Sequence, residues 1–237
     1  MRRVIQIPTR PRYVLNFTIA IMNTAGSRDF NKEAAQWDQD QRRVKLASDV
    51  AAAIIREVSP TRDMDALDFG CGTGLVTLHL QPLVKTMTAV DSSSGMLGVL
   101  EEKLKIRNIS NVNPVFIDFE SGAHLRKPIV EGKKFHLLVS SMTMHHVPDT
   151  AVLLRMWHDL LLPEGLICAA DLDAEDGSFH GDNTGVYHFG FERAKLMELM
   201  RRAGFKNLRD STASTMVKEV EGKSREFTVF LITGRKS

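Results

Sequence analysis

The 237-residue sequence has little of what marks secreted or membrane-bound proteins. It has two cysteines, Cys71 in a glycine-rich stretch and Cys168 in an apolar run, and neither has a partner spaced for zinc. No apolar run approaches the roughly 18 residues that a membrane-spanning helix needs. Because cytoplasmic proteins rarely rely on disulfides, we expect a protein of the reducing cytoplasm that has no membrane span.

The sequence also lacks a dominant charge, since 31 Lys and Arg oppose 29 Asp and Glu, for a net charge of +2. Four arginines lie within the first 12 residues, well ahead of the first acid, Asp29, and without them the rest of the chain carries about −2. They are Arg2, Arg3, Arg10 and Arg12. A body so close to neutral gives no indication of a nucleic-acid or membrane surface as a partner.

A chain of this length can bury a sizeable core without metals or disulfides. We expect residues 1–29 to form a flexible extension and residues 30–237 to form one domain, whose oligomeric state stays open. The polar segment 30–41 contains one aromatic residue, Trp37. It either folds over a ligand as a lid or uses Trp37 to anchor a helix, and we favour the anchor.

The central feature is the stretch 66–74, Ala-Leu-Asp-Phe-Gly-Cys-Gly-Thr-Gly. It predicts a buried strand that ends near Asp68 and enters a tight turn, and the apolar spacing of residues 75–84 predicts a helix behind it. Glycines let backbone approach a ligand closely, and the start of a helix offers unpaired N–H groups. A plain chain reversal is the alternative. A dinucleotide turn would need glycine where Leu75 stands.

Strands and helices alternate along the rest of the chain. Further strands are predicted at 86–90, 112–117, 135–142 and 166–171, and helices at 44–58, 94–107, 150–162 and 191–203. Residues 208–220 and 227–233 predict a closing hairpin. The pattern predicts an α/β fold with a doubly wound, Rossmann-like, seven-stranded sheet, mostly parallel with an antiparallel C-terminal hairpin, and helices on both faces.

Two of these strands end in acids. Asp91, followed by Ser92, stands 23 residues beyond Asp68, at the tip of the second strand. A carboxylate there can accept both hydroxyls of a ribose, or it can cap the helix that follows. The third strand ends at Asp118 and Phe119, an acid and an aromatic ring suited to an adenine amino group and face, although acids are also common turn formers.

Together these pieces resemble the class I S-adenosylmethionine (SAM)-dependent methyltransferases from about residue 30 to the C-terminus. The matching motifs are residues 67–74, 89–92, 117–119, 140–147 and 162–166. Within that fold, the His-His-Val-Pro-Asp run at 145–149 and the closing hairpin look most like the small-molecule branch with the ubiquinone and menaquinone methyltransferases. The resemblance implies an enzyme that transfers a methyl group from SAM to oxygen, carbon or nitrogen of a small organic acceptor.

The resemblance also implies which residues bind the cofactor. Asp68 and the turn Gly70, Cys71, Gly72, Thr73 and Gly74 would hold the methionine end of SAM. Asp91 and Ser92 would hold the ribose, Asp118 and Phe119 the adenine, with Met96 bordering it and Ser140 at the tip of the fourth strand. A SAM-binding module that no longer catalyses and acts through a protein partner would carry the same set, and turnover separates the two readings.

Methyl transfer needs the nucleophile, methyl group and sulfur held in line, and a general base helps when the acceptor is a hydroxyl. The candidates are His145, His146, His180 and His188, with Tyr187 as an orienting group. Plain packing is the alternative for His145 and His146, and a solvated loop is the alternative for His180 and His188. The choice among them stays open.

A divalent ion could bind in the acidic loop beyond the fifth strand, at Asp171, Asp173, Glu175, Asp176, His180 and Asp182. The calcium-loop pattern fails, however, because Gly177 is one place late and no Glu follows at the twelfth position, so we expect no bound metal. Other methyltransferase classes lack support as well. No Asn/Asp-Pro-Pro-Tyr/Phe run of the DNA-base or glutamine type follows the fourth strand, the acid of the catechol type is missing there, and neither cysteine lies in a loop for arsenic chemistry.

Overall fold

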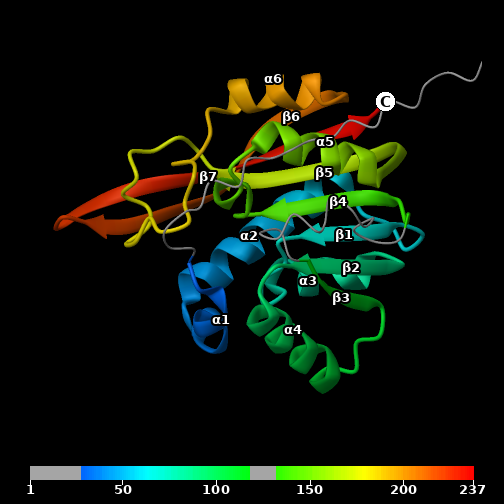
Figure 1. The fold of residues 1–237 in the computed structure, drawn as a ribbon, viewed down its shortest axis with the longest axis horizontal. Helices are drawn as coiled ribbons and strands as arrows, with labels where there is room; N and C mark the ends of the chain where they lie inside the picture. The colour runs from blue at the N-terminus through cyan, green and yellow to red at the C-terminus, as the bar shows by residue number, and fades with distance from the viewer. Residues whose placement is uncertain (1–27, 118–131) are drawn as a thin grey trace, which may run out of the picture.

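The computed structural model describes residues 28–117 and 132–237, which form a seven-stranded sheet in the order β3-β2-β1-β4-β5-β7-β6 (Figure 1). The pairs β1–β2, β1–β4, β2–β3 and β4–β5 are parallel, whereas β7 is antiparallel to both β5 and β6. The predicted mostly parallel sheet with an antiparallel C-terminal hairpin is confirmed.

The strands are β1 (Asp65–Phe69), β2 (Thr86–Asp91), β3 (Val112–Phe116), β4 (Phe135–Ser141), β5 (Leu161–Leu172), β6 (Phe205–Val220) and β7 (Lys223–Lys236). The α-helices are α1 (Phe30–Glu33), α2 (Gln41–Val58), α3 (Leu75–Leu80), α4 (Ser94–Ile106), α5 (Thr150–Leu160) and α6 (Arg193–Arg202). Short 3-10 turns are η1 (Ala34–Gln39), η2 (Gln81–Leu83) and η4 (Met144–His146).

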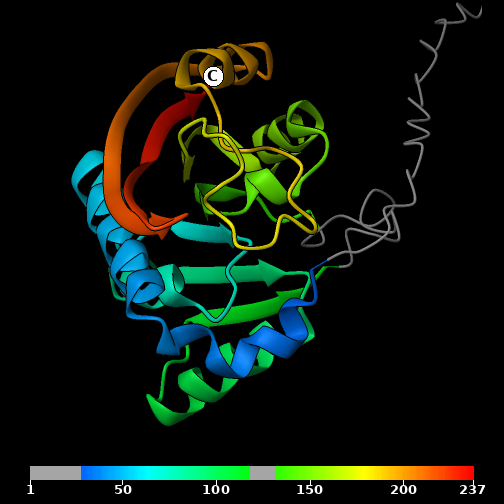
Figure 2. The same ribbon diagram turned by 90° about the vertical axis from the view of Figure 1, so that its left-hand side faces the viewer.

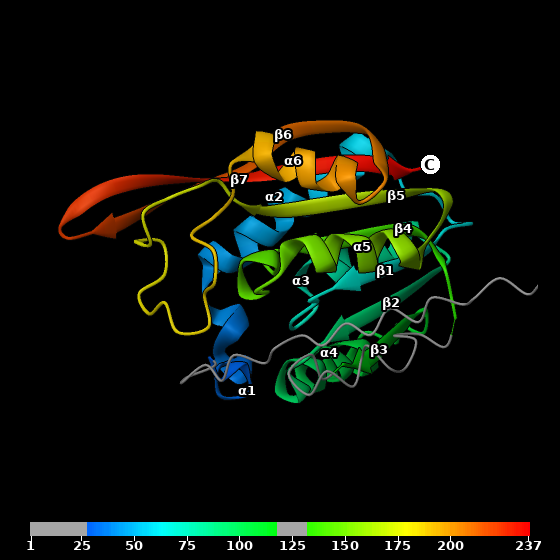
Figure 3. The same ribbon diagram turned by 45° about the horizontal axis from the view of Figure 1, so that its top comes forward.

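Helices cover both faces of the sheet, as predicted. On one face, apolar side chains of α2, α3 and α4 pack on the strands, among them Ile54, Leu80 and Leu100. On the other face lie α5 and α6, where Trp157 and Met200 are fully buried (Figure 3). Strands β1, β2 and β4 are buried almost throughout, which is why they read as continuous apolar runs.

The boundary between α5 and β5 differs from the prediction. The helix ends at Leu160 and the strand begins at Leu161, five residues before the predicted start. The pairing with β4 shifts between Phe135↔Leu161 and Leu137↔Leu166, so the Pro163 region is an irregularity within the strand. A Cβ at Gly165 would lie 2.8 Å from the carbonyl oxygen of Leu162, so this irregularity requires glycine.

The closing hairpin is also longer than predicted. Its two-residue turn, Glu221 and Gly222, has positive φ at both positions, the geometry that suits a tight hairpin. Residues 223–228 of β7 pair with β6 alone, beyond the last residue that pairs with β5. Figure 2 shows β6 and β7 curving together as one bent ribbon. This ribbon supports the loop between β5 and α6.

Two sets of predictions lie outside the described residues. They are residues 1–27 of the extension expected at 1–29, and the adenine pair Asp118 and Phe119. Within the described ranges, no helix combines the length and the apolar character that a bilayer crossing requires.

Candidate active site

The parallel strands β1, β2, β4 and β5 end at one edge of the sheet, and the predicted site residues follow those ends. Two other segments lie beyond this edge in both Figures 1 and 3. One is residues 28–40, called the cap below, and the other is residues 173–192, called the β5–α6 loop. Ligands of open parallel sheets bind at such carboxyl ends.

The glycine turn after β1 is built from backbone contacts. The N–H groups of Gly70 and Cys71 donate to the carbonyl oxygen of Val90, at 2.9 and 3.0 Å. At Gly70, with φ of +74°, a Cβ would lie 2.2 Å from Oγ1 of Thr143. At Gly72, with φ of +54°, a Cβ would meet no atom within 4 Å. The turn is therefore closely packed against Thr143 at Gly70 and open at Gly72. Such an open backbone position is what a closely bound ligand needs.

Asp91 lies beside this turn. Its Oδ2 accepts from the N–H of Gly72 at 2.7 Å and its Oδ1 from the N–H of Ser93 at 2.8 Å. The helix cap is Ser93, whose hydroxyl accepts from the N–H of Met96, so the alternative of Asp91 as the cap is wrong. Burial raises the pKa of Asp91, although the hydrogen bonds from these N–H groups act to lower it. Each carboxylate oxygen keeps a lone pair for a ribose hydroxyl.

Asp68 is buried beneath the turn. Its Oδ2 accepts from the hydroxyl of Thr77 at 2.5 Å, a contact that ties β1 to the first turns of α3. Burial, with a smaller contribution from the charge of Asp91, raises the pKa of Asp68 to about 7, against the opposing effect of Thr77. A cation placed here would favour the ionised form.

The other predicted cofactor residues differ in what their side chains do. The hydroxyl of Ser140 is buried and donates to the carbonyl oxygen of Phe69, so it braces β1 against β4. The Cys71 thiol is directed to the carbonyl oxygen of Gly72, and burial raises its pKa well above the usual value. Met96 is buried in the core, and Ser92 is exposed.

The cap is attached to the cofactor edge by two polar contacts. Asn31 Oδ1 accepts from the N–H of Gly95 at 2.7 Å, at the start of α4. A Cβ at Gly95 would lie 2.9 Å from Cα of Asn31, so glycine permits this approach. Asp38 accepts from the hydroxyl of Thr73 at 2.6 Å and pairs with Lys103. The Thr73 side chain is therefore bound to the cap.

Trp37 holds the cap from the other side. The guanidinium carbon of Arg43 lies 3.8 Å from the centre of its ring, and Phe30 packs edge-on at 5.9 Å. Trp37 therefore anchors the segment, as one hypothesis for residues 30–41 predicted. The segment also lies over the strand ends, as the alternative hypothesis of a lid predicted.

The tips of β4 and β5 bring His145 and Asp171 together. Nδ1 of His145 lies 2.7 Å from Oδ1 of Asp171, and both side chains are at most 1% exposed. Burial would raise the pKa of Asp171, but His145 and the N–H groups of His145 and Leu172 hold it below its usual value. The ionised carboxylate can only accept, so Nδ1 carries a proton, and in the neutral form of the ring Nε2 presents a lone pair.

Two more histidines stack beside this pair. The ring centre of His146 lies 4.1 Å from that of His145, and that of His180 lies 5.0 Å from it. Burial, followed by the repulsion of His145, lowers the pKa of His146 to about 4 and that of His180 to about 3. Both rings are neutral near pH 7. Nδ1 of His146 donates to the carbonyl oxygen of Gly185 at 2.7 Å, which fixes that ring.

Tyr187 and His188 act differently from what was expected. The backbone N–H of Tyr187 donates to the carbonyl oxygen of His145 at 2.9 Å, while 42% of the residue is exposed. Nε2 of His188 lies 3.0 Å from the carbonyl oxygen of Val147 and 3.3 Å from the hydroxyl of Thr150. Through these two contacts the His188 side chain braces the turn after β4.

The acids of the β5–α6 loop are engaged with protein groups. Asp173 pairs with Arg193 at 2.7 Å, Asp176 pairs with Arg225 at 2.6 Å, and Glu175 accepts from two backbone N–H groups of the loop. Among residues 28–117 and 132–237, no three His, Cys, Asp or Glu side chains are grouped so as to hold a metal ion.

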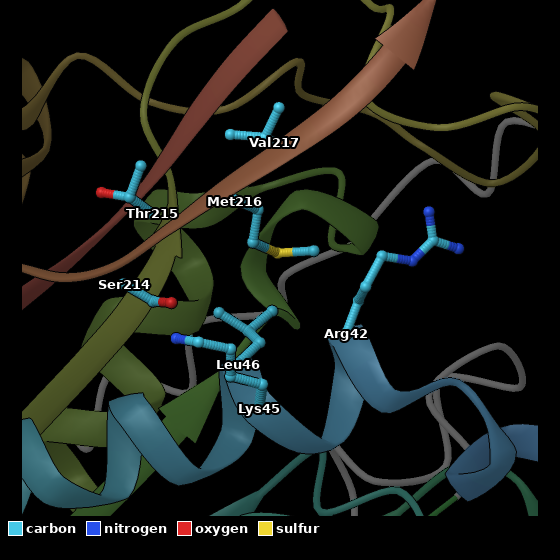
Figure 4. A pocket seen from close by; sticks show the side chains of 7 residues that line it. All are labelled: Arg42, Lys45, Leu46, Ser214, Thr215, Met216 and Val217. Atoms are coloured by element: carbon cyan, nitrogen blue, oxygen red, sulfur yellow. The ribbon is translucent and has the colours of Figure 1, made fainter. Parts of the chain in front are cut away.

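A hollow of about 230 Å³ lies between α2 and β6 (Figure 4). Leu46 and Met216 line it together with Arg42 and Lys45. Its cations are already paired, Arg42 with Asp40 at 3.0 Å and Lys45 with an acid one turn further along α2. None of the predicted site residues lines this hollow.

Comparisons with known proteins agree with this geometry. A sequence model of the methyltransferase domain matches residues 39–210, so the chain belongs to this methyltransferase family, whose methyl donor is SAM. An uncharacterized methyltransferase from Schizosaccharomyces pombe is 31% identical over 180 residues, which are 71% of this chain and 62% of that protein. A ubiquinone biosynthesis O-methyltransferase from Azorhizobium caulinodans is 24% identical over 124 residues, 52% of this chain and 46% of that protein.

Among solved structures, phosphoethanolamine N-methyltransferase 2 of Haemonchus contortus in complex with SAM superposes with a TM-score of 0.63. It is 14% identical and covers 89% of this chain and 60% of that one, a similarity of fold. The matched segments span about half to three fifths of the length of the two sequence relatives. The expected family, fold and cofactor are confirmed.

Sequence reasoning missed three partners at this edge. Asp171 was considered only as a metal ligand, and Thr77 and Asn31 were not considered at all. Asp171 lies at the end of the apolar run of β5, just as Asp68 and Asp91 lie at or near the ends of β1 and β2. This shared position is the sequence signal that could have identified Asp171. Asn31 carried no signal, because its partner lies 64 residues away.

Proposed function

We propose that this protein transfers a methyl group from SAM to a small organic acceptor, with His145 as general base and Asp171 as the group that orients it. The observation that carries the proposal is the buried pair of His145 Nδ1 and Asp171 Oδ1 at 2.7 Å, beside the glycine turn. A non-catalytic SAM-binding module would have no use for an oriented imidazole base at this place. General bases of this kind accelerate reactions by about 10²–10⁴-fold.

The cofactor side is proposed to use Asp91 and the open face of Gly72 for the ribose and the methionine end of SAM. Two features support this. Gly72 has free space where a side chain would stand, and Asp91 is oriented by two backbone N–H groups. A ribose offers two hydroxyls that a carboxylate accepts. Bound SAM would then supply an electrophilic methyl group, while the cap excludes water.

We also infer a small molecule, and no nucleic acid, as the acceptor, and a cytoplasmic location. The balanced charge of the chain supports the first inference, and a small acceptor agrees with the way the cap closes over the strand tips. The two cysteines are free and buried, as in proteins of reducing compartments, which supports the second.

The experiment has two stages. Calorimetry with SAM, S-adenosylhomocysteine and NAD is expected to give binding with the first two and none with NAD. Methyl-labelled SAM is then incubated with a library of small hydroxyl, amine and carbon acceptors, and formation of S-adenosylhomocysteine is followed. Binding of NAD in place of SAM would refute the proposal, and binding of SAM with no turnover on any acceptor would favour the binding module.

A further inference from the structure

Two ring nitrogens at the strand tips have no hydrogen-bond partner within the part of the chain that the structure describes, residues 28–117 and 132–237. They are Nε2 of His145 and Nε2 of His180, and both atoms are buried. Their rings are neighbours, with centres 5.0 Å apart and planes inclined by 37°. Buried polar atoms in folded proteins almost always have partners, so two adjacent atoms without one indicate the place of a polar group that joins them.

The two nitrogens have different capacities. His145 donates from Nδ1 to Asp171, so in the neutral ring that a base requires its Nε2 accepts a hydrogen bond. His180 is neutral near pH 7 because burial and the neighbouring His145 and His146 lower its pKa to about 3. A neutral imidazole can present an N–H at Nε2. A hydroxyl, which donates once and accepts as well, suits both nitrogens with a single oxygen atom.

The charges around His180 favour oxygen over an amine. Besides the histidines, the charged groups that act on it are Arg28 of the cap and Lys218 of β6, and both are cations. Asp171 is engaged by His145 on the far side of the first ring. Arg28 is itself paired with Glu33 at 2.7 Å, so it is mainly the positive charge of Lys218 that disfavours an ammonium group and stabilises an oxygen that is losing its proton.

His180 is held in place although it lies in a loop. The side chain of Phe179, next to it, is buried against Phe227 of β7, with ring centres 5.3 Å apart. Lys218 donates to the carbonyl oxygen of Phe179. Glu175 accepts from the N–H of Phe179 at 3.0 Å. These contacts fix the backbone on which His180 stands, so its ring is preorganised.

On the basis of the proposed function, we propose that the acceptor group is the neutral hydroxyl of a phenol or an alcohol, held between Nε2 of His145 and Nε2 of His180. The hydroxyl proton moves to Nε2 of His145 as the oxygen attacks the methyl carbon. The sulfur–methyl bond breaks with its electron pair staying on sulfur, and an ether and S-adenosylhomocysteine result. Nε2–H of His180 stabilises the negative charge that develops on the oxygen, and His145 later returns the proton to water.

The test uses three probes of one shape, phenol, aniline and toluene, added to the full chain saturated with S-adenosylhomocysteine. Methanol and methylamine serve as aliphatic counterparts. Nitrogen-15 spectra of the histidine rings report on each Nε2 atom. Phenol or methanol is expected to shift the Nε2 signals of both His145 and His180, while aniline, methylamine and toluene leave them unchanged. Equal shifts with the amines, or no shift with either hydroxyl probe, would overturn the proposal.

The variant His180→Phe keeps a ring and removes both nitrogens, and His180→Asn serves as a second variant if the first one folds poorly. With a hydroxyl acceptor from the library, we expect turnover about 100-fold below that of the unaltered chain, the usual loss for one donor to a developing oxyanion. Binding of S-adenosylhomocysteine should stay within about 3-fold, a change of at most about 0.7 kcal/mol.

The matched control is His136→Gln, at the opposite end of β4, where the ring only accepts from the N–H of Asp65. This control variant is expected to leave the Nε2 signals of His145 and His180, and the turnover, unchanged. The two proposals fail differently. Loss of S-adenosylhomocysteine binding from the unaltered chain would refute the proposed function itself, whereas intact binding with turnover on amines alone would refute only the hydroxyl acceptor.

Discussion

The two halves of the active edge are built in different ways. At the tips of β1 and β2, backbone N–H groups, a carboxylate and glycines from residues 68–93 make the cofactor side. At the tips of β4 and β5, side chains far apart in the sequence, such as Asp171 and His145, make the acceptor side. The first half depends on a local turn and the second on long-range packing. Substitutions should therefore separate binding of SAM from chemistry.

The largest effect is expected on the acceptor side. His145→Ala removes the proposed base, so methyl transfer should fall by about 10³-fold, within the range for general bases. SAM affinity should change by less than about 3-fold, because no cofactor contact is lost. Initial rates with the acceptor found in the library screen, and calorimetry with SAM, measure the two quantities.

Asp171→Asn is the companion variant, since it keeps the shape of the side chain and removes the charge that orients Nδ1 of His145. It should lower the rate as well and leave SAM binding intact. If both variants turned over at the unaltered rate, the base would have to be another group.

On the cofactor side, Asp91→Ala should weaken SAM binding by about 100-fold, because two hydrogen bonds from the ribose to a carboxylate are lost. The variant also loses the partners of the Gly72 and Ser93 N–H groups. The ring signals of His145 and His180 should be unchanged, which would show that the acceptor side is intact. Unaltered affinity for SAM would rule out the ribose role.

The cap links the two halves, and two glycines of α4 allow a matched test of it. Gly95→Ala places a methyl group 2.9 Å from Cα of Asn31, whereas Gly98→Ala meets nothing within 4 Å. We expect trypsin to cleave within residues 28–43 about 10-fold faster in the first variant, with weaker SAM binding. Alanine is the better helix former at both positions, by about 1 kcal/mol at Gly98 and by less at Gly95, which lies in the first turn of α4. Equal cleavage in the two variants would mean that the Asn31 contact does not hold the cap.

The smallest effect concerns protons on the cofactor side. Burial raises the pKa of Asp68 to about 7, so at pH 6 the ligand-free protein holds a proton there. SAM carries a sulfonium and an ammonium, and a cation nearby lowers the pKa of a carboxyl group. Binding should therefore release part of a proton at pH 6 and almost none at pH 8, and affinity should rise with pH through about 7.

Calorimetry in buffers of different ionisation enthalpy measures this release. Asp68→Asn keeps the acceptor oxygen for the Thr77 hydroxyl and cannot titrate, so it should abolish the difference between pH 6 and pH 8. Release that persists in this variant would have to come from another group.

Sequence patterns predicted most of the fold, because apolar periodicity and turn residues act over short distances. Helix α2 stops at Ser59, in the left-handed region at φ of +46°, just before Pro60, as the pattern indicated. The start of β5 was missed by five residues, because Pro163 is accommodated by an irregularity that only pairing with β4 stabilises. The length of β6 and β7 was also missed, since polar strand residues outside the parallel core give no apolar signal.

The candidate site divides in the same way. The glycine turn and Asp91 could be identified from their spacing, because the turn geometry itself requires those residues. Among the four candidate histidines, the sequence offered no means of choosing, since the choice depends on what lies beside each ring. The proposed choice of His145 rests on Asp171 beside His145 and on the carbonyl oxygen of Val147 beside His188, and both are contacts between distant segments.

Local chemistry in the chain was sufficient to specify the sheet, its glycine turn and the carboxylate proposed to bind a ribose, because neighbouring residues impose these features on one another. Packing of the whole domain was needed to bury His145 against Asp171, to stack His180 beside it and to dock Asn31 on Gly95. Hydrogen bonds and pKa shifts of this kind depend on burial, and burial exists only once the strands, the cap and the β5–α6 loop have come together.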